Sequence, residues 1–141
     1  MIELIATAES VEQAVELLAT GVDTLYIGEE IFGLRLPVSF TRDEQREIVK
    51  RAHEMGKQVL VAVNGIMHPE KMKLVPEYLT FLKEINVDKI TLGDPGIVFI
   101  MQRDGLEIPY VYDGETLVTS SRQINFWSKR GAIGAVLALS L

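Results

Sequence analysis

The chain has 141 residues, of which 20 are acidic and 14 basic, and it carries a formal net charge of −6. Its 48% of hydrophobic residues fits one ordered globular domain, and its acidic balance leaves no basic patch for holding nucleic-acid phosphates. The absence of cysteine excludes a disulfide, a thiolate zinc site or an iron–sulfur cluster held by this chain, and no apolar run nears the roughly 20 residues that cross a membrane, so we expect a cytoplasmic protein.

The first unit is a strand followed by a helix. Residues 1–8 form a short apolar run that ends in small residues and predicts a strand. Ser10 and Gln13 have the spacing of a capping box, and apolar residues recur at helical intervals through 11–18. Gly21 is expected to end this helix in the left-handed conformation.

The second unit contains a long connection. Residues 24–27 predict a strand that ends at Gly28. The next helix begins only at Thr41, which forms a second capping box with Glu44, and Gly56 ends that helix. The connection between the two is longer than a simple link requires.

The third and fourth units repeat the pattern. Residues 58–63 predict a β-branched strand, Pro69 suits the first position of the following helix, and Pro76 is expected to kink or restart that helix. Residues 87–92 predict the fourth strand. Gly93-Asp94-Pro95 then combines a strand end, an N-cap and a first-turn proline ahead of a helix over 96–102.

The last units bring the prediction to six strands and five helices. Residues 110–112 predict the fifth strand, a capping pair at Ser120 and Gln123 precedes a helix over 124–130, and 133–139 predict the sixth strand. A tight turn at Asp113-Gly114 is a local alternative, which would make Tyr110–Tyr112 antiparallel to Thr116–Thr119.

The alternation of strands and helices predicts an α/β fold with a parallel sheet, because several strands are apolar on both faces and need helices to cover them. Two architectures share this pattern. One is an open doubly wound sheet, and the other is a (β/α)8 barrel, which usually needs about 250 residues and would here stop after six strands. Periodicity alone does not choose between them.

Both architectures bind ligands at the carboxyl ends of their strands. The polar residues at those ends are therefore candidates for a site that binds an anionic substrate and moves protons. In the order of strands one to five they are Thr7 and Glu9; Glu29, Glu30 and Arg35; Asn64 and His68; Asp94; and Asp113, Glu115 and Thr116.

Each candidate also has a structural interpretation. Asp94 fits an N-cap, Glu29 and Glu30 fit solvated loop residues, and His68 fits a helix start. Arg35 lies between two leucines, where a guanidinium is costly to bury unpaired, so we expect Glu29 or Asp94 to hold it.

Several common motifs for metal binding, nucleotide binding and hydrolysis are absent from the sequence. His53 is expected on an exposed helix surface, and two histidines without the HxxxH spacing predict no metal site. The chain lacks GxxxxGK[ST], GxGxxG and GxSxG, so nucleotide cofactors and serine hydrolysis lose their usual sequence support.

Several long segments together resemble the N-terminal part of the peptidase U32 family, the collagenase-like proteases. They are ELIATAESVEQAVELLATGVDTLYIGEEIFGLRL, FTRDE, VLVAVNGIMH, ITLGDPGIV and NFWSKRGAIGAVLA, and they cover nearly the whole chain. Within the family, the chain is most similar to the paired proteins of Gram-positive bacteria that are linked to 5-hydroxyuridine formation at the tRNA wobble position.

The resemblance implies a partial (β/α) TIM-barrel-like domain, with six parallel strands, helices outside and a site at the strand carboxyl ends. The family's Tyr-x-Gly run matches Tyr26 to Gly28, and its loop Phe and Arg match Phe32 and Arg35. The resemblance thereby favours Thr7, Tyr26, Gly28, Arg35 and Asn64 as substrate-binding residues, and Glu29, His68, Asp94 and Glu115 as catalytic candidates.

Full-length relatives close strand six with Ala-Arg-Glu-Leu, and cysteines that follow hold an iron–sulfur cluster in several branches. Here Ala138 is followed by Leu139-Ser140-Leu141, so we expect residues 1–141 to form one truncated barrel segment that is inactive alone and holds no cofactor.

The resemblance leaves three functions open: tRNA wobble-uridine hydroxylation with a paired U32 protein, genuine peptide cleavage, and a non-catalytic half-barrel module for assembly. The open edges of a sheet that ends after six strands, at residues 1–8 and 133–139, further predict self-association, most simply as a two-fold dimer.

Overall fold

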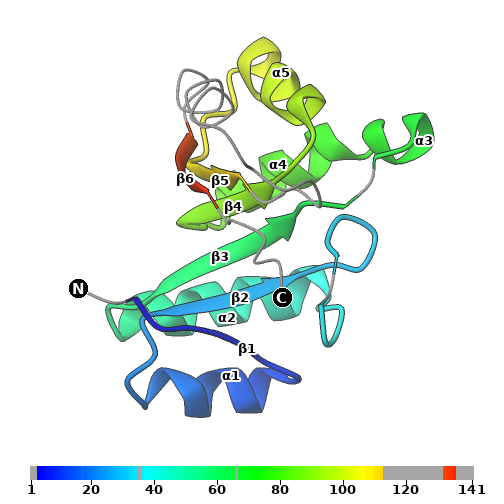
Figure 1. Ribbon diagram of the computed structural model, residues 1–141. Coiled ribbons are helices and arrows are strands. Elements are labelled where there is room, and N and C mark those ends of the chain that lie inside the picture. Colours follow the sequence, from blue (N-terminus) through cyan, green and yellow to red (C-terminus); the bar gives the residue numbers. More distant parts are fainter. Residues whose placement is uncertain (1–2, 35, 66, 113–131, 136–141) are drawn as a thin grey trace, which may run out of the picture.

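The computed structural model describes residues 3–34, 36–65, 67–112 and 132–135. Within them, six strands form one sheet whose neighbours follow the chain order. Figure 1 shows this sheet rising from the first strand at the bottom to the sixth at the top. The strands are β1 (Ile5–Thr7), β2 (Thr24–Gly28), β3 (Gln58–Val63), β4 (Lys89–Leu92), β5 (Tyr110–Tyr112) and β6 (Ala132–Ala135).

All five pairings between neighbouring strands are parallel. A doubly wound sheet would reverse its order about the first strand, and this sheet does not, so the open-sheet alternative is wrong. Consecutive parallel strands with helices between them are the repeating unit of a (β/α) barrel. The predicted partial barrel of six parallel strands is confirmed.

Five helices fill the connections among the described residues: α1 (Val11–Leu18), α2 (Arg42–Glu54), α3 (Pro69–Met72), α4 (Val75–Glu84) and α5 (Pro95–Asp104). In Figure 1 they lie along one side of the twisted sheet, from α1 beside the lowest strand to α5 near the highest. The long helices α2 and α4 carry the residues that cover the middle strands.

The hydrophobic core lies between the sheet and these helices. Alternate residues of the central strands, such as Leu25, Val61 and Ile90, are fully buried and pack with apolar residues of the helices, such as Ile48 and Leu79. The opposite face of the sheet corresponds to the interior of a barrel. Residues Val59 to Val63 of β3 are all buried, so this strand is covered on both faces of the sheet, which explains its continuous apolar run.

Local sequence signals explain where most helices begin. Thr41 and Glu44 form the predicted capping box, with Thr41 Oγ1 accepting from the Glu44 N–H and Glu44 Oε1 accepting from the Thr41 N–H. Pro69 begins α3 and Pro76 lies in the first turn of α4, so the helix restarts as predicted. Asp94 is the N-cap of α5, and its Oδ1 accepts from the Gly96 N–H at 2.8 Å.

The prediction for Gly21 is wrong. Helix α1 ends at Leu18, and the left-handed glycines among the described residues are Gly56 and Gly105. Thr20 replaces the expected glycine cap, because both its N–H and its hydroxyl donate to the Leu17 carbonyl, at 3.0 and 2.6 Å. A hydroxyl that satisfies a terminal carbonyl removes the need for a left-handed residue.

Some strand and helix ends differ from the predicted ranges. Strand β1 covers only residues 5–7 of the expected 1–8, β4 begins at Lys89 rather than at residue 87, and α5 continues to Asp104. Strand β6 covers 132–135, whereas 133–139 were expected, and residues 136–139 lie outside the described part. The predicted helix over 124–130 and the alternative turn at 113–114 also lie outside it.

Polar contacts join the elements at the amino edge of the sheet. Asp88 Oδ2 accepts from the Val59 N–H at 2.7 Å and lies 2.9 Å from His53 Nε2. This cluster connects α2 to the starts of β3 and β4. His53 is exposed, as predicted, although it also makes this hydrogen bond to Asp88. Lys89 Nζ lies 3.6 Å from Glu3 Oε1 at the same edge.

Gly33, in the connection after β2, lies directly against β3. A Cβ atom at Gly33 would lie 2.7 Å from the Ala62 Cβ and 2.8 Å from the Leu36 Cδ1. We expect Gly33→Ala to lower the free energy of unfolding by about 1–3 kcal/mol through overpacking, measured by urea denaturation. Gly21→Ala is the matched control, because nothing lies within 4 Å of its Cβ position, and it should leave stability unchanged or slightly higher. Equal effects at both positions would contradict this packing.

Candidate functional site

The inner face of the sheet presents hydroxyl groups near the carboxyl edge. Tyr26, Leu60 and Lys89 share one row across the strands, and the register places Gly28, Ala62 and Thr91 in the next row toward that edge. The Tyr26 hydroxyl lies 3.1 Å from Thr91 Oγ1. Thr91 is buried, whereas Tyr26 is only half-buried, so the pair links a solvent-reachable phenol to the sheet.

The connection at residues 29–41, which we call the β2 loop, folds over this edge. The Leu34 N–H donates to Asn64 Oδ1 at 3.0 Å, and the Gly65 N–H donates to the Phe32 carbonyl at 2.8 Å. Asn64 and Gly65 directly follow β3, so the two connections are joined by hydrogen bonds where their strands end. Asn64 therefore lies, as predicted, at the edge of the sheet where the carboxyl ends of the strands meet, which we call the mouth.

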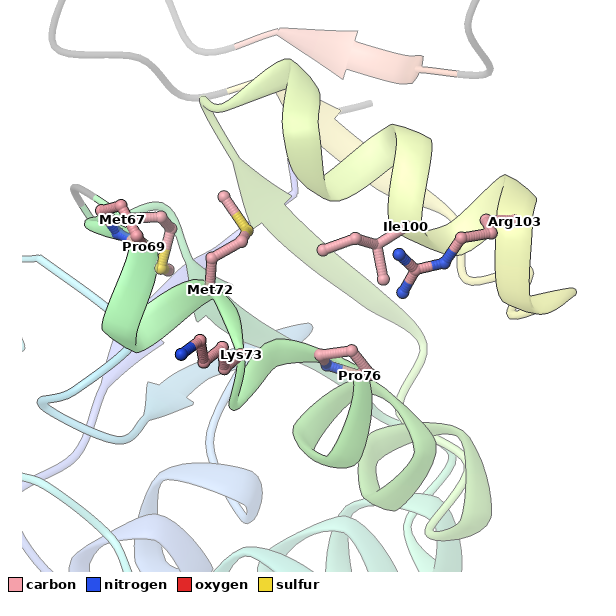
Figure 2. A pocket seen from close by; sticks show the side chains of 7 residues that line it. All are labelled: Met67, Pro69, Met72, Lys73, Pro76, Ile100 and Arg103. Atoms are coloured by element: carbon pink, nitrogen blue, oxygen red, sulfur yellow. The ribbon is translucent and has the colours of Figure 1, made fainter.

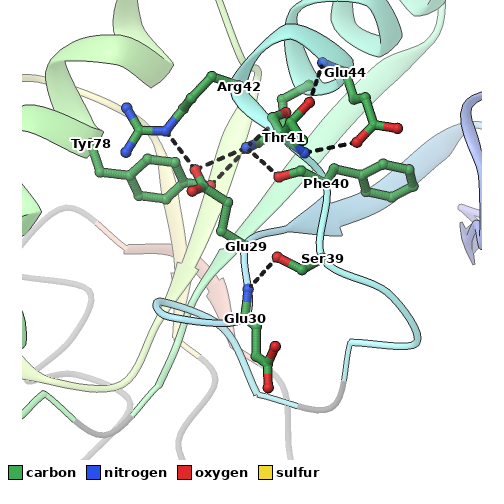
Figure 3. Close-up of polar contacts among 9 residues, drawn as sticks. Glu29, Glu30, Ser39, Phe40, Thr41, Arg42, Glu44 and Tyr78 are labelled. Atoms are coloured by element: carbon green, nitrogen blue, oxygen red, sulfur yellow. Dashed lines mark hydrogen bonds and ion pairs between the residues drawn. The ribbon is translucent and has the colours of Figure 1, made fainter.

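Glu29 lies on the helix side of the β2 loop. Its Oε2 accepts from Arg42 Nε at 2.7 Å and from Gln45 Nε2 at 2.9 Å (Figure 3). Both donors belong to α2. The expected interpretation of Glu29 as a solvated loop residue is wrong, because its side chain is only 17% exposed and is ion-paired.

A buried tyrosine supports this arrangement. The Tyr78 hydroxyl of α4 donates to Gln45 Oε1 at 2.7 Å, and its ring stacks on Phe32 of the β2 loop with 4.2 Å between ring centroids. The Arg42 guanidinium carbon lies 4.9 Å from the Tyr78 ring centroid. Burial, and then the negative charge of Glu29, raise the pKa of the Tyr78 phenol well above its ordinary value.

The remaining predicted site residues have separate positions. Thr7 ends β1 and is exposed, and Glu9 is exposed. Glu30 is also exposed, as its structural interpretation predicted, and its N–H donates to Ser39 Oγ at 2.9 Å. His68 is the exposed N-cap residue of α3, as its structural interpretation predicted, and makes no side-chain capping bond. Asp94 caps α5 from the carboxyl end of β4.

Several predictions concern residues outside the described part. They are Arg35, Asp113, Glu115 and Thr116. Of the two carboxylates expected to hold Arg35, Glu29 bonds to Arg42 and Gln45, and Asp94 Oδ1 accepts from the Gly96 N–H.

A groove of about 630 Å³ lies outside the barrel face, between α3 and the start of α4 on one side and α5 on the other (Figure 2). Its lining is mainly apolar, with two basic side chains. The lining residues are Met67, Pro69, Met72, Lys73, Pro76, Ile100 and Arg103. Arg103 also donates to both carboxylate oxygens of Asp104, at 2.9 and 3.1 Å.

The described residues do not fit a metal cofactor. They contain no group of three histidine, aspartate or glutamate side chains close enough to hold an ion. An iron–sulfur cluster, which the family resemblance raises, requires cysteine ligands, and the chain has none. The helices in the described ranges also include none that is both long and apolar enough to span a membrane.

The sequence interpretation missed Gln45, Tyr78, Arg42 and Thr91. A signal existed for two of them. Gln45 lies at helical spacing from the apolar residues Ile48, Val49 and Ala52, so a polar residue faces the core there and must be hydrogen-bonded. Tyr78 lies in the apolar stripe of α4 in the same way. Nothing in the sequence around Thr91, apart from its place in a predicted strand, indicated a site residue.

Among the described residues, the groups that lie at the mouth are mainly neutral hydrogen-bonding side chains. The Tyr26 and Thr91 hydroxyls and the Asn64 amide come from three successive strands and can orient a polar ligand. Glu29 is directed to the helices, and Asp94 follows β4 directly and caps α5.

Comparison with protein families gives a match over almost the whole chain. The model of peptidase family U32 matches residues 9–141. The tRNA hydroxylation protein P2 of Bacillus subtilis is 34% identical over 99% of this chain and 45% of its own length. The tRNA hydroxylation protein P1 of the same organism is 29% identical over 96% of this chain and 32% of its own length. The chain thus spans less than half the length of these relatives.

Solved structures support the fold. A U32 peptidase superposes with a TM-score of 0.77 at 16% identity, over 97% of this chain and 58% of the other. An aldolase from Escherichia coli K12 superposes with a TM-score of 0.65 at 16% identity, over 96% of this chain and 53% of the other. At these identities the similarity shows a shared barrel architecture.

Replacing Tyr78 by phenylalanine tests the buried network. The change leaves Gln45 Oε1 without its donor, so we expect the free energy of unfolding at pH 7 to fall by about 1–3 kcal/mol. Since the folded-state pKa of Tyr78 is raised, its contribution is complete below the unfolded value of 10.0 and is lost as the pH rises toward the folded value.

Urea denaturation at pH 7 to about pH 11 measures both effects. Wild-type stability should fall more steeply above about pH 10 than that of Tyr78→Phe, so the difference between the two proteins should shrink. A constant difference across this range would show that the phenol does not titrate differently in the folded and unfolded states.

Proposed function

Because the chain belongs to peptidase family U32, we propose that it contributes to hydroxylation of the wobble uridine of tRNA at carbon 5. The observation that supports this most directly is the match of nearly the entire chain to a tRNA hydroxylation protein at 34% identity. Such a substrate places the protein in the cytoplasm.

Other relatives support the same class of reaction. A tRNA hydroxylation protein of Escherichia coli is 24% identical over 99% of this chain. A 23S rRNA 5-hydroxycytidine synthase from that bacterium is 31% identical over 69% of this chain. The second name specifies a hydroxyl group on a pyrimidine base in RNA, which is the chemistry that we propose here for uridine.

In this proposal the mouth of the sheet binds a small polar molecule that takes part in the hydroxylation of the uridine. Tyr26, with Thr91 behind it, and Asn64 would donate and accept hydrogen bonds to polar groups. Gly28, also in the proposed substrate-binding set, would support the mouth by letting Leu36 pack closely, since its Cβ position lies 3.1 Å from the Leu36 Cδ1. Thr7 and Arg35 complete the proposed substrate-binding set. Asp94, His68 and Glu115 remain the proposed catalytic candidates, and the chain contains no cysteine that could hold an iron–sulfur cluster.

Two other functions remain as outcomes of the test. A relative from Methanocaldococcus jannaschii, 28% identical over 92% of this chain, is named as a protease, which corresponds to peptide cleavage. A non-catalytic module would act only by assembly with a partner protein. Among the described residues, the mouth has no serine–histidine pair, and the chain has no cysteine, which supports binding of small polar molecules over peptide cleavage.

Deleting the gene in its own host tests the proposal. We expect 5-hydroxyuridine to disappear from digested tRNA, as measured by liquid chromatography and mass spectrometry, and to return when the gene is restored. Purified protein should leave gelatin intact. Unchanged 5-hydroxyuridine together with gelatin cleavage would establish the peptidase instead, and unchanged 5-hydroxyuridine without cleavage would favour the assembly module.

We also propose that this chain associates with a paired U32 protein or with itself through the β1 edge. Relatives numbered P1 and P2 occur in one organism, which supports a paired arrangement. In the described sheet β1 pairs with β2 alone, and the side chains of Leu4 and Ile5 are each 52% exposed. An apolar sheet edge is a template for pairing with another chain.

Light scattering after size-exclusion chromatography of the 141-residue chain tests self-association. We expect a dimer at micromolar concentration, and Ile5→Lys should shift it toward monomer, because a lysine on an edge opposes pairing. Gln102→Lys on exposed α5 adds the same charge elsewhere and should leave the dimer intact. A wild-type chain that is monomeric and unfolds cooperatively would refute self-association.

A further inference from the structure

One buried side chain holds both ends of the β2 loop. Gln45 of α2 is 0% exposed. Its amide nitrogen donates to Glu29 Oε2 at the start of the loop, at 2.9 Å, and to the Phe40 carbonyl at its end, at 3.2 Å. Its amide oxygen accepts from Tyr78 at 2.7 Å. The amide is thereby satisfied by the loop and by the helix that supports it.

Glu29 is the other half of this contact. Its carboxylate accepts from Arg42 and Gln45, while its backbone carbonyl accepts from the N–H groups of Phe32 and Gly33, at 3.0 and 2.9 Å. Every one of these contacts stabilises the path of the chain immediately after β2. The carboxylate points to α2 and α4 (Figure 3), whereas Tyr26 and Thr91 lie on the opposite face of the sheet.

Further contacts of the β2 loop connect Glu29 and Gln45 to the mouth of the sheet. Phe32 stacks on Tyr78, and its carbonyl accepts from the Gly65 N–H. Leu34 then donates to Asn64, which is one of the groups proposed to bind substrate. The contact between Glu29 and Gln45 is thus connected to Asn64 through Phe32 and Leu34 of the β2 loop.

We propose that Glu29 is a positioning residue and not the catalytic carboxylate, and that Gln45 clasps it so that the β2 loop forms a fixed wall of the substrate mouth. This inference rests on the proposed function for its activity readout. A loop that is already ordered before binding spares the reaction the entropy of ordering it, which is the advantage of preorganisation.

Two single variants test the proposal. Gln45→Glu places two carboxylates against each other, so we expect hydrogen exchange at the Phe32, Gly33 and Phe40 amides to accelerate about 10-fold or more. In the host, 5-hydroxyuridine in tRNA should fall by a similar factor. Glu29→Gln removes the carboxylate but keeps a side-chain oxygen that can accept from Arg42 and Gln45, so it should leave both measurements within about 3-fold of wild type.

The matched control is Glu47→Gln on the same helix, whose exposed pair with Arg51 is remote from the loop, and it should change neither measurement. A Glu29→Gln variant that keeps slow exchange but makes no 5-hydroxyuridine would overturn the proposal and identify Glu29 as catalytic, since proton transfer is worth about 10²–10⁴-fold.

The two proposals fail in different ways. If the wild-type gene supports no 5-hydroxyuridine, the proposed function is wrong, and the exchange rates alone decide whether Gln45 clasps the loop. If the wild-type gene does support it and Gln45→Glu changes neither exchange nor 5-hydroxyuridine, the clasp is wrong and the proposed function stands.

Discussion

Parallel pairing of consecutive strands is the constraint on which the rest of this molecule depends. Each strand has to return to the same end of the sheet before the next begins, and the connections from β1 to β5 cross over through helices. Two consequences follow. One face of the sheet is covered by helices and becomes the core, and all carboxyl ends meet at one edge. Polar side chains from distant parts of the sequence therefore lie close together at this edge, although no sequence pattern links them directly.

The mouth depends on contacts that are themselves remote from it. Glycines at 28 and 33 let the β2 loop approach Ala62, and a stack of aromatic rings under Arg42 supports the loop from the helix side. A buried amide and carboxylate would be costly if either lost its partner. The network is satisfied here, since the described part of the chain has no buried side-chain nitrogen or oxygen without a hydrogen bond.

Much of this fold could be predicted from local patterns, because caps and prolines act within one turn. Thr41 with Glu44, Pro69, Pro76 and Asp94 each mark a helix start that the structure has. The strand order required the family resemblance, since periodicity does not encode which strands pair. The prediction that Gly21 caps α1 is wrong because the Thr20 hydroxyl, one residue earlier, donates to the Leu17 carbonyl at the end of the helix.

The site was less predictable for a different physical reason. A residue at the end of a strand can point to either face of the sheet or into the loop, and sequence position does not decide which. Glu29 follows β2 directly, yet its side chain bonds to α2, and its partner Gln45 is sixteen residues further along. Hydrogen bonds between helices and loops depend on tertiary packing, so Gln45 and Tyr78 become informative only once the fold is known.

The cluster of His53, Asp88 and Val59 lies at the opposite end of the sheet from Asn64 and Thr91. A barrel built in this way separates the residues that secure its framework from those that meet ligands. The two ends are therefore free to diverge independently. A lineage can acquire a new reactant specificity by exchanging side chains at the mouth while keeping its thermal tolerance, and it can adapt to a new growth temperature through the amino edge without altering what it binds.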